Sequence, residues 1–267
     1  MDGKRNPVRI KAFCVGQAKS GTASLVGLLS TNYRAAHEPE RPELLDMILR
    51  ESRGELSAGD FRKVLLERDV RLNLEYDVSW VNQFVIGHLL DVFPASKFIV
   101  LIRDSYSWLQ SAIGHVISRE LPSEIVNFLP WWVNPERYPH SRQDRALAER
   151  GLYSIAAYLH AWNDHVNRCT PQIPEDRRLV LRTHELAHSH ARLADFLEIP
   201  LDTLDAGSGH QNRSTWADRI ESLVDPGYID TMVQSVCADN MNRYFPEVRN
   251  AQDVPGLWEA VPRETAT

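Results

Sequence analysis

The chain has 267 residues, of which 43% are hydrophobic and 25% are charged, and 30 basic residues stand against 36 acidic ones, for a net charge of −6. This composition is that of a folded globular protein and excludes a disordered, collagen-like or coiled-coil chain. Because the balance is acidic, a broad basic surface is disfavoured although local basic pockets remain open, and we expect neither nucleic acid nor an anionic lipid surface as a partner.

Short apolar runs alternate with helical patterns along the chain. Residues 9–16 form a strand-like run that ends in glycine, and residues 22–30 follow with leucines at helical spacing. Further strands are predicted in the run that ends at 35–40, and at 70–75, 97–102 and 178–182. Strands separated by helices predict a three-layer α/β fold with a central parallel sheet of about five strands flanked by helices.

We expect a single domain over residues 1–267. Residues 122–139 contain Pro130, Trp131 and Trp132 and interrupt the helical pattern before a long helix predicted at about 143–167. They predict an insertion or lid over about 121–142, which is either an ordinary packed loop or an element that contacts the substrate. The residues from about 250 to 267 are rich in proline and acid and predict a loosely held tail.

Cysteine usage and the lack of long apolar segments predict a soluble, cytoplasmic protein. The three cysteines, Cys14, Cys169 and Cys237, are far apart and form no C-x-x-C pair, which argues against a disulfide framework and a zinc ribbon. No segment approaches about eighteen uninterrupted apolar residues, and the first residues lack the apolar core of a signal peptide.

A glycine-containing loop, residues 16–22 (GQAKSGT), joins the first predicted strand to the first predicted helix. Its backbone N–H groups and the positive end of the helix would converge on an anion such as phosphate. Lys19 would add a mobile charge, and Ser20 and Thr22 would add hydroxyl donors. Thr22 stands where the nucleoside-triphosphatase pattern G-x-x-x-x-G-K-[ST] requires lysine, so a kinase or ATPase is disfavoured.

Three sequence elements, in the same order, resemble the family of sulfotransferases that depend on 3′-phosphoadenosine 5′-phosphosulfate (PAPS). The run Lys19-Ser20-Gly21-Thr22 resembles the family's 5′-phosphosulfate loop, [RK]-S-G-T. Arg103 follows the strand 97–102 and Ser111 lies eight residues later, which resembles the family's element for the 3′-phosphate. Residues 179–186 and 193–200 resemble the strand, the E-D-L turn and the F-L-G-[IV]-P helix end of these enzymes.

The resemblance covers about residues 8–215 and is nearer to the bacterial and Golgi-like branch, because the chain lacks an R-K-G-x-x-G-D-W run. It implies a P-loop-like enzyme that moves a sulfuryl group from PAPS to a hydroxyl of a small-molecule or carbohydrate acceptor without a metal. The residues implied to bind the nucleotide are Lys19, Ser20, Gly21, Thr22, Ala23, Arg103 and Ser111, joined by His210, Asn212 and Arg213 of a C-terminal loop on positional grounds. No residue is assigned to the adenine ring, because Ser24 stands where relatives often carry tryptophan.

The acceptor proton needs a base, and the sequence leaves several candidates open. In similar enzymes a glutamate in the turn after the second strand often serves, which makes Glu38 the first choice and Glu40 an alternative. His37 has a suitable unperturbed pKa. Glu75, at the end of the strand predicted over 70–75, is the other contender. The resemblance implies that Lys19 stabilises the charge that develops on the leaving oxygen.

Two other functions are compatible with the sequence. His184-Glu185-Leu186-Ala187-His188 matches H-E-x-x-H, in which two histidines on one helix face bind zinc and the glutamate is the base of a metalloprotease. The match directly follows a predicted strand, which places His184 in a turn, and no third ligand is evident. A non-catalytic module that binds 3′-phosphoadenosine 5′-phosphate (PAP) without turnover is the second alternative.

Overall fold

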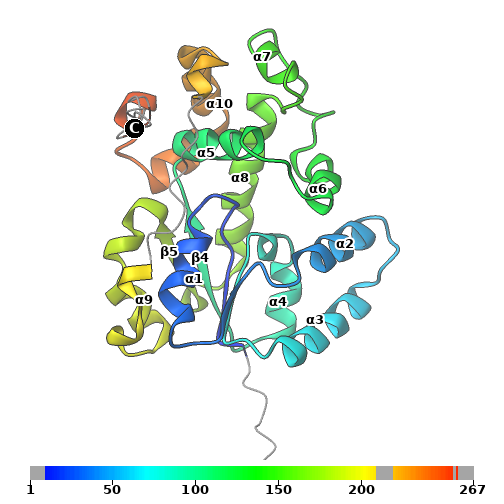
Figure 1. The fold of residues 1–267 in the computed structure, drawn as a ribbon, viewed down its shortest axis with the longest axis vertical. Coiled ribbons are helices and arrows are strands. Elements are labelled where there is room, and N and C mark those ends of the chain that lie inside the picture. Colours follow the sequence, from blue (N-terminus) through cyan, green and yellow to red (C-terminus); the bar gives the residue numbers. More distant parts are fainter. Residues whose placement is uncertain (1–9, 209–218, 255–256, 258–267) are drawn as a thin grey trace, which may run out of the picture. The chain divides into compact units, whose positions relative to one another are not determined.

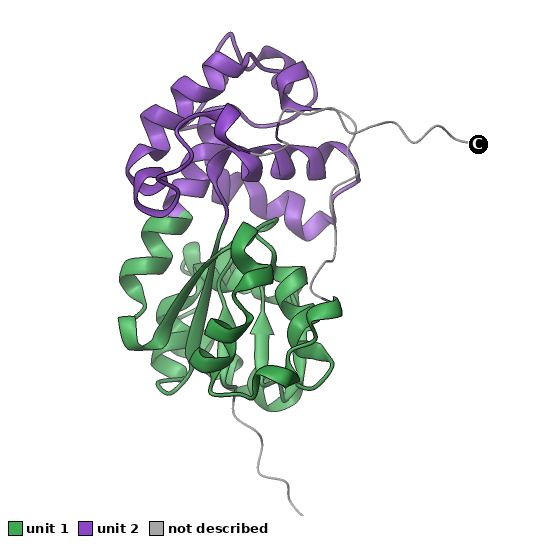
Figure 2. Cartoon of the chain, turned by 90° about the vertical axis from the view of Figure 1, so that its left-hand side faces the viewer, with its two compact units in different colours: residues 1–102, 165–213 green, residues 103–164, 214–267 purple. Residues whose placement is uncertain are grey.

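The computed structural model describes residues 10–208, 219–254 and 257. The chain divides into two compact units (Figure 2). The first unit consists of residues 1–102 and 165–213, and the second of residues 103–164 and 214–267.

The first unit is built on a five-stranded sheet with the strand order β2-β3-β1-β4-β5. Strands β4 and β5 are labelled in Figure 1. The strands are β1 Ala12–Cys14, β2 Ala35–His37, β3 Tyr76–Val78, β4 Lys97–Ile102 and β5 Arg178–Arg182. Every pairing is parallel; β1 lies between β3 and β4, with Ala12 opposite Tyr76 on one side and Lys97 on the other. The carboxyl ends of all five strands therefore share one edge of the sheet, and the predicted parallel α/β sheet is confirmed.

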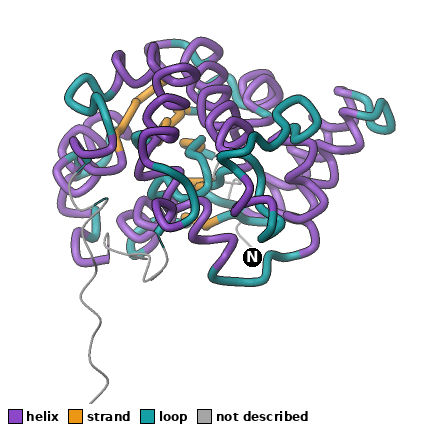
Figure 3. The backbone as a smooth tube through the Cα atoms, turned by 90° about the horizontal axis from the view of Figure 1, so that it is seen from above, coloured by secondary structure: helices purple, strands orange, loops and turns teal. Residues whose placement is uncertain are grey.

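Helices cover both faces of this sheet, and in Figure 3 the short orange strands lie among them. The helices of the first unit are α1 Thr22–Ser30, α2 Arg41–Ser52, α3 Ala58–Leu72, α4 Ile86–Val92 and α9 His190–Leu197, together with the last part of α8 Ile155–Gln172. Alternate residues of β4 enter opposite layers. Ile99 and Leu101 join a core cluster with leucines of α1 and α9. On the opposite face, the ring of Phe13 lies 5.7 Å from that of Phe98.

The second unit is helical. It contains α5 Ser105–Ile117, α6 Ser123–Val133, α7 Arg145–Ala148, the first part of α8 and α10 Pro226–Tyr244. Its largest buried side chains include Trp108, Trp162, Phe128 and Phe245. The buried Asp144 carboxylate accepts a hydrogen bond of 3.0 Å from the backbone N–H of Ile155, which fixes the start of α8.

Several predicted elements agree with the structure, and three differ. The helix over 22–30 and the strands over 97–102 and 178–182 are confirmed. The strand predicted over 70–75 is wrong, because α3 continues to Leu72 and ends at Asn73 in the left-handed conformation, so that β3 starts only at Tyr76. The helix predicted over 143–167 is interrupted at Gly151, whose φ is +66°. Within the predicted lid, residues 123–133 form α6, which tolerates Pro130 in its last turn.

All three cysteines are free and buried. Among the described residues, no helix combines the length and the apolar character needed to cross a membrane.

One buried histidine links α8 to the end of β4. His165 is 1% exposed; its Nδ1 lies 2.9 Å from Gln83 Oε1 and its Nε2 lies 3.4 Å from the carbonyl oxygen of Leu101. Burial lowers the pKa of His165 to about 3. The imidazole is therefore neutral in the folded protein near neutral pH.

The depressed pKa of His165 predicts acid sensitivity. Below pH ~6.5 this histidine takes up a proton in the unfolded chain, whereas in the folded protein it stays neutral down to about pH 3. The free energy of unfolding therefore falls as the pH falls through this window. We expect His165 to account for about 2 kcal/mol of the unfolding free energy lost between pH 7 and pH 5. Urea unfolding of His165→Asn should show a smaller loss over this interval than wild type, whereas the exposed control His188→Asn should match wild type. An unchanged slope in His165→Asn would contradict the assignment.

Candidate active site

The loop that leaves β1, residues 15–21, is folded tightly on itself. The Ser20 hydroxyl donates a hydrogen bond of 2.7 Å to the carbonyl oxygen of Gln17, and the Ser20 N–H donates to the same oxygen at 3.1 Å. Gln17 and Ser20 are each 1% exposed. The hydroxyl proton of Ser20 is therefore used inside the loop, which differs from the prediction that this hydroxyl would face an anion.

Two residues of the loop adopt the left-handed conformation that turns backbone N–H groups toward a common point. Lys19 has φ +70° and Gly21 has φ +100°. Gly21 is also the N-cap of α1, which has neither a side-chain cap nor an acidic residue in its first turn. The N–H groups of a first helical turn have no acceptor within the helix, and they carry the positive end of the helix dipole. The loop thus presents a compact array of donors suited to an anion, beside the half-buried Lys19.

Thr183, the residue directly after β5, holds this loop against the sheet. Its hydroxyl oxygen lies 2.6 Å from the carbonyl oxygen of Ser20 and 3.1 Å from that of Ile102, so one proton is shared between two acceptors. Its methyl carbon lies 3.3 Å from the position that a Cβ would take on Gly21. Sequence reasoning missed Thr183, because its partner Ser20 is 163 positions away and no local pattern marks the pairing.

A chain of polar side chains runs from the loop to the turn after β2. Thr22 Oγ1 lies 3.0 Å from His37 Nε2, which lies 3.7 Å from Glu38 Oε1. Arg41 Nη1 donates to Glu38 Oε2 at 2.5 Å. Partial burial of the imidazole, assisted by the Arg41 charge, outweighs the Glu38 carboxylate and lowers the pKa of His37. A neutral imidazole, able to accept a proton, therefore stands one hydrogen bond away from the loop.

The other two base candidates are bound elsewhere. Both carboxylate oxygens of Glu40 accept hydrogen bonds from Arg71, at 2.9 and 2.7 Å, and this interaction lowers the pKa of Glu40. Glu75 precedes β3 and so lies at the amino edge of the sheet, opposite to the loop, which corrects the prediction that it ends a strand. Although burial acts to raise the pKa of Glu75, the hydrogen bonds from Lys11 and from the Arg34 backbone outweigh it and lower that pKa.

In the second unit, Arg103 lies just before α5, and Ser111 lies in the middle of that helix. Asp104 caps this helix by accepting a hydrogen bond of 2.8 Å from the N–H of Ser107, and Arg103 Nε donates to the Ser107 hydroxyl, also at 2.8 Å. Ser111 lies one helical turn beyond Ser107, on the same face, and is 7% exposed. Burial lowers the pKa of Arg103, although a guanidinium stays charged in proteins. The predicted residues His210, Asn212 and Arg213 lie outside the described part of the chain.

The H-E-x-x-H match does not form an α-helical zinc motif. Residues Thr183–His188 form a 3₁₀-helix, in which residues four apart are turned by about 120° from one another instead of sharing a face. The Glu185 carboxylate pairs with Arg182, and this hydrogen bond lowers the pKa of Glu185. Over residues 10–208, 219–254 and 257, no group of three or more histidine, cysteine, aspartate or glutamate side chains is arranged to hold a metal ion. His184 and His188 therefore do not share the helix face that the zinc alternative requires.

Comparisons with known proteins point to one family. Residues 11–204 match the model of the sulfotransferase domain. No curated protein gives a significant match.

Solved structures similar to this chain are also sulfotransferases. One, from Alicyclobacillus acidocaldarius, is 18% identical, with 86% of this chain and 95% of that chain covered and a TM-score of 0.47. Sulfotransferase STF9 from Mycobacterium avium is 15% identical, with coverages of 90% and 78% and a TM-score of 0.46. The sulfotransferase domain of the Synechococcus PCC 7002 olefin synthase is 15% identical, with 82% of each chain covered and a TM-score of 0.40.

The packing of Gly16 predicts that its substitution distorts the loop. A Cβ at this position would lie 2.5 Å from Ser20 Oγ and 3.0 Å from Leu101 Cβ, so these neighbours must move. We expect Gly16→Ala to cost about 1–3 kcal/mol in unfolding free energy, as overpacking does, and to weaken phosphate binding. The matched control is Gly87→Ala in α4, where no atom lies within 4 Å of the added Cβ and alanine should stabilise the helix slightly. Equal stabilities and equal phosphate affinities in the two variants, measured by urea unfolding and calorimetry, would contradict this account.

Proposed function

Since the chain belongs to the sulfotransferase domain family, we propose that it moves a sulfuryl group from PAPS to a hydroxyl of a small-molecule or carbohydrate acceptor. The observation that carries this proposal is the hydrogen bond of 3.0 Å between His37 and Thr22, the first residue of α1, directly after the loop. It joins a backbone suited to an anion to a side chain able to take a proton, and sulfuryl transfer needs both.

The donor would be held at its two charged ends. We assign the 5′-phosphosulfate to Lys19 and to the backbone of Ser20, Gly21, Thr22 and Ala23, at the first turn of α1, which no side chain caps. We assign the 3′-phosphate to Arg103 and Ser111, with His210, Asn212 and Arg213 as further nucleotide contacts. Support comes from the sheet: ligands of open parallel sheets bind beyond the carboxyl ends of the strands, where the strand order reverses, and Lys19 and Arg103 follow the adjacent strands β1 and β4.

The proposed reaction is a direct transfer. The acceptor oxygen forms a bond to sulfur while the bond between sulfur and the bridging oxygen of the donor breaks, and PAP leaves with that oxygen. The acceptor's proton passes to the His37–Glu38 pair. Lys19 and the loop amides stabilise the negative charge that develops on the leaving oxygen. No step requires a metal ion.

The first test compares two nucleotides. If Arg103 and Ser111 bind the 3′-phosphate, PAP should bind with a lower Kd than 5′-AMP, which lacks this phosphate. At equal concentrations PAP should then raise the melting temperature more, since stabilisation grows with the ratio of ligand concentration to Kd and reaches about 2.7 kcal/mol at ~100 times Kd. Arg103→Met should remove most of the difference. Arg145→Met is the matched control, because Arg145 is an exposed arginine of the same unit. Equal shifts with PAP and 5′-AMP in wild type would contradict the assignment of the 3′-phosphate.

The second test addresses the base. Removing a general base should lower kcat by about 10²–10⁴-fold and leave the PAP-induced thermal shift unchanged. Glu38→Gln and His37→Asn are therefore compared for the rate of transfer from labelled PAPS across pH. In the variant whose replaced residue is the base, the transfer rate should no longer rise with pH. Full activity in both variants would contradict the assignment, and PAP binding without transfer to any hydroxyl would instead favour a non-catalytic module.

A further inference from the structure

We propose that Arg68, a buried arginine of α3, is a positioning residue that holds the turn carrying His37 and Glu38 in place. This inference rests on the proposed function, because it concerns the support of the proposed base. Arg68 has no feature in the sequence that distinguishes it from the other arginines of the chain.

The turn after β2 needs such support. Glu38 and Glu40 both adopt the left-handed conformation, with φ +50° and +49°, and Pro39 lies between them. This conformation costs free energy for a residue with a Cβ, so contacts around the turn must stabilise it. On the side of the sheet, the Glu38 N–H donates to the carbonyl oxygen of Val78 at 2.9 Å.

The guanidinium of Arg68 supplies the contacts on the other side. Its side chain is 8% exposed, and Nη2 donates to the carbonyl oxygen of Pro39 at 2.6 Å, while Nε lies 3.6 Å from Glu40 Oε2. Nη1 donates to Asp77 Oδ2 in β3 at 2.7 Å. A planar guanidinium can reach these groups at once, whereas the single ammonium of lysine cannot reproduce this geometry. Arg71 also pairs with the Glu40 carboxylate. We call Arg68 and Arg71, with their contacts to Pro39 and Glu40, the clamp.

The same network reaches the strand that leads into the loop. Asn82 Nδ2 lies 3.0 Å from Asp77 Oδ1 and 3.2 Å from the carbonyl oxygen of Cys14, the last residue of β1. One set of buried polar groups therefore contacts both the end of β1, two residues before Gly16, and the turn with the proposed base. Its geometry links the two parts of the proposed reaction centre within the first unit.

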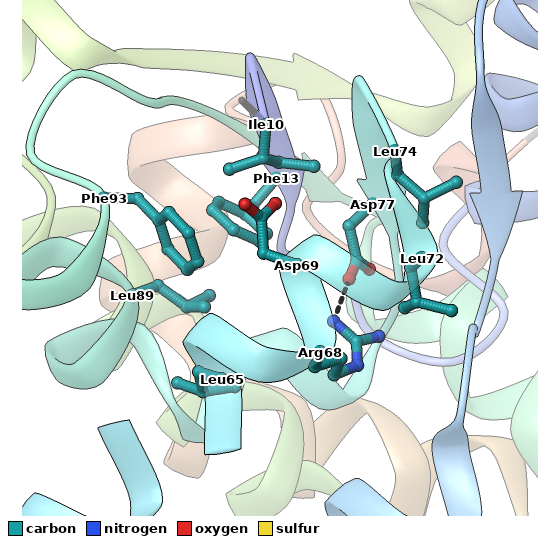
Figure 4. Close-up of a pocket in the computed structure, with 10 residues that line it drawn as sticks. All are labelled: Ile10, Phe13, Leu65, Arg68, Asp69, Leu72, Leu74, Asp77, Leu89 and Phe93. Atoms are coloured by element: carbon teal, nitrogen blue, oxygen red, sulfur yellow. Dashed lines mark hydrogen bonds and ion pairs between the residues drawn. The ribbon is translucent and has the colours of Figure 1, made fainter. Parts of the chain in front are cut away.

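The surroundings of Arg68 explain why its partners matter. Figure 4 shows Arg68 and Asp77 at the wall of a small cavity whose other lining residues, apart from Asp69, are apolar. The cavity measures about 10 Å³, room for roughly one water molecule and too little for a substrate. In such surroundings a charged side chain requires its partner, but a buried ion pair as a whole is weak support for stability. Positioning of the turn gives the pair a role beyond stability.

The experiment separates positioning from stability with two variants and a control. Glu40→Gly removes the carboxylate that Arg68 and Arg71 contact, but glycine accepts the left-handed conformation readily, so the unfolding midpoint should stay near that of wild type. In Arg68→Lys the charge is kept and the planar fork is lost. Asp46→Asn removes an exposed carboxylate of α2 outside the clamp and is the matched control.

We expect Glu40→Gly and Arg68→Lys to lower kcat by about tenfold or more, since misplacement by ~1 Å can cost about 100-fold. The acceptor KM and the Kd of PAP should stay within about twofold of wild type, and Asp46→Asn should match wild type throughout. Retained kcat in Glu40→Gly and Arg68→Lys would overturn the proposal. So would a loss of kcat that is accompanied by parallel losses of PAP affinity and of the unfolding midpoint.

A readout without turnover keeps this inference separate from the proposed function. The ring signals of His37 in nitrogen–proton NMR spectra, assigned with His37→Asn, report on the imidazole beside Thr22. They should shift in Glu40→Gly and Arg68→Lys and stay in place in Asp46→Asn. Unshifted signals in the two clamp variants would overturn the positioning role. Absence of transfer from PAPS by wild type, with shifted signals in those variants, would contradict the proposed function alone.

Discussion

The chemistry of the first unit depends on the parallel pairing of five short strands. Because β1 is paired in parallel with β3 and β4, and β2 and β5 extend the sheet in the same direction, every strand ends at the same edge. The loop of residues 15–21 follows β1, His37 ends β2 with Glu38 directly after it, and Thr183 follows β5. Residues that are far apart in the sequence thus reach one side of the unit through strands of three to six residues.

Internal hydrogen bonds fix the groups at this edge before any ligand binds. The hydroxyls of Ser20 and Thr183 are both used on carbonyl oxygens, and Thr22 is engaged with His37. Side chains that a sequence motif suggests as ligand contacts therefore hold the shape of the loop. In the proposed reaction, a backbone held in this way would need little rearrangement on binding, which favours electrostatic stabilisation of a developing charge.

The sequence predicted those features that depend on local patterns. The strand over 97–102 is a continuous apolar run, and the helix over 22–30 has leucines at helical spacing, so both were found with their bounds. The strand predicted over 70–75 is wrong because α3, whose buried face carries residues at helical spacing, continues to Leu72, and Glu75 is misplaced with it. The roles of Arg68 and Thr183 could not be predicted, because their partners Pro39 and Ser20 are 29 and 163 positions away and only the fold brings them together.

The burial of the native thiols has a practical consequence. Cys14, Cys169 and Cys237 all lie in the interior, and burial raises the pKa of each thiol, which keeps the unreactive protonated form. Alkylating reagents attack thiolates that solvent can reach, so the three native thiols should not react with them in the folded protein. A single cysteine introduced on an exposed helix would then take up a fluorophore or spin probe selectively, without prior removal of the native sulfhydryls.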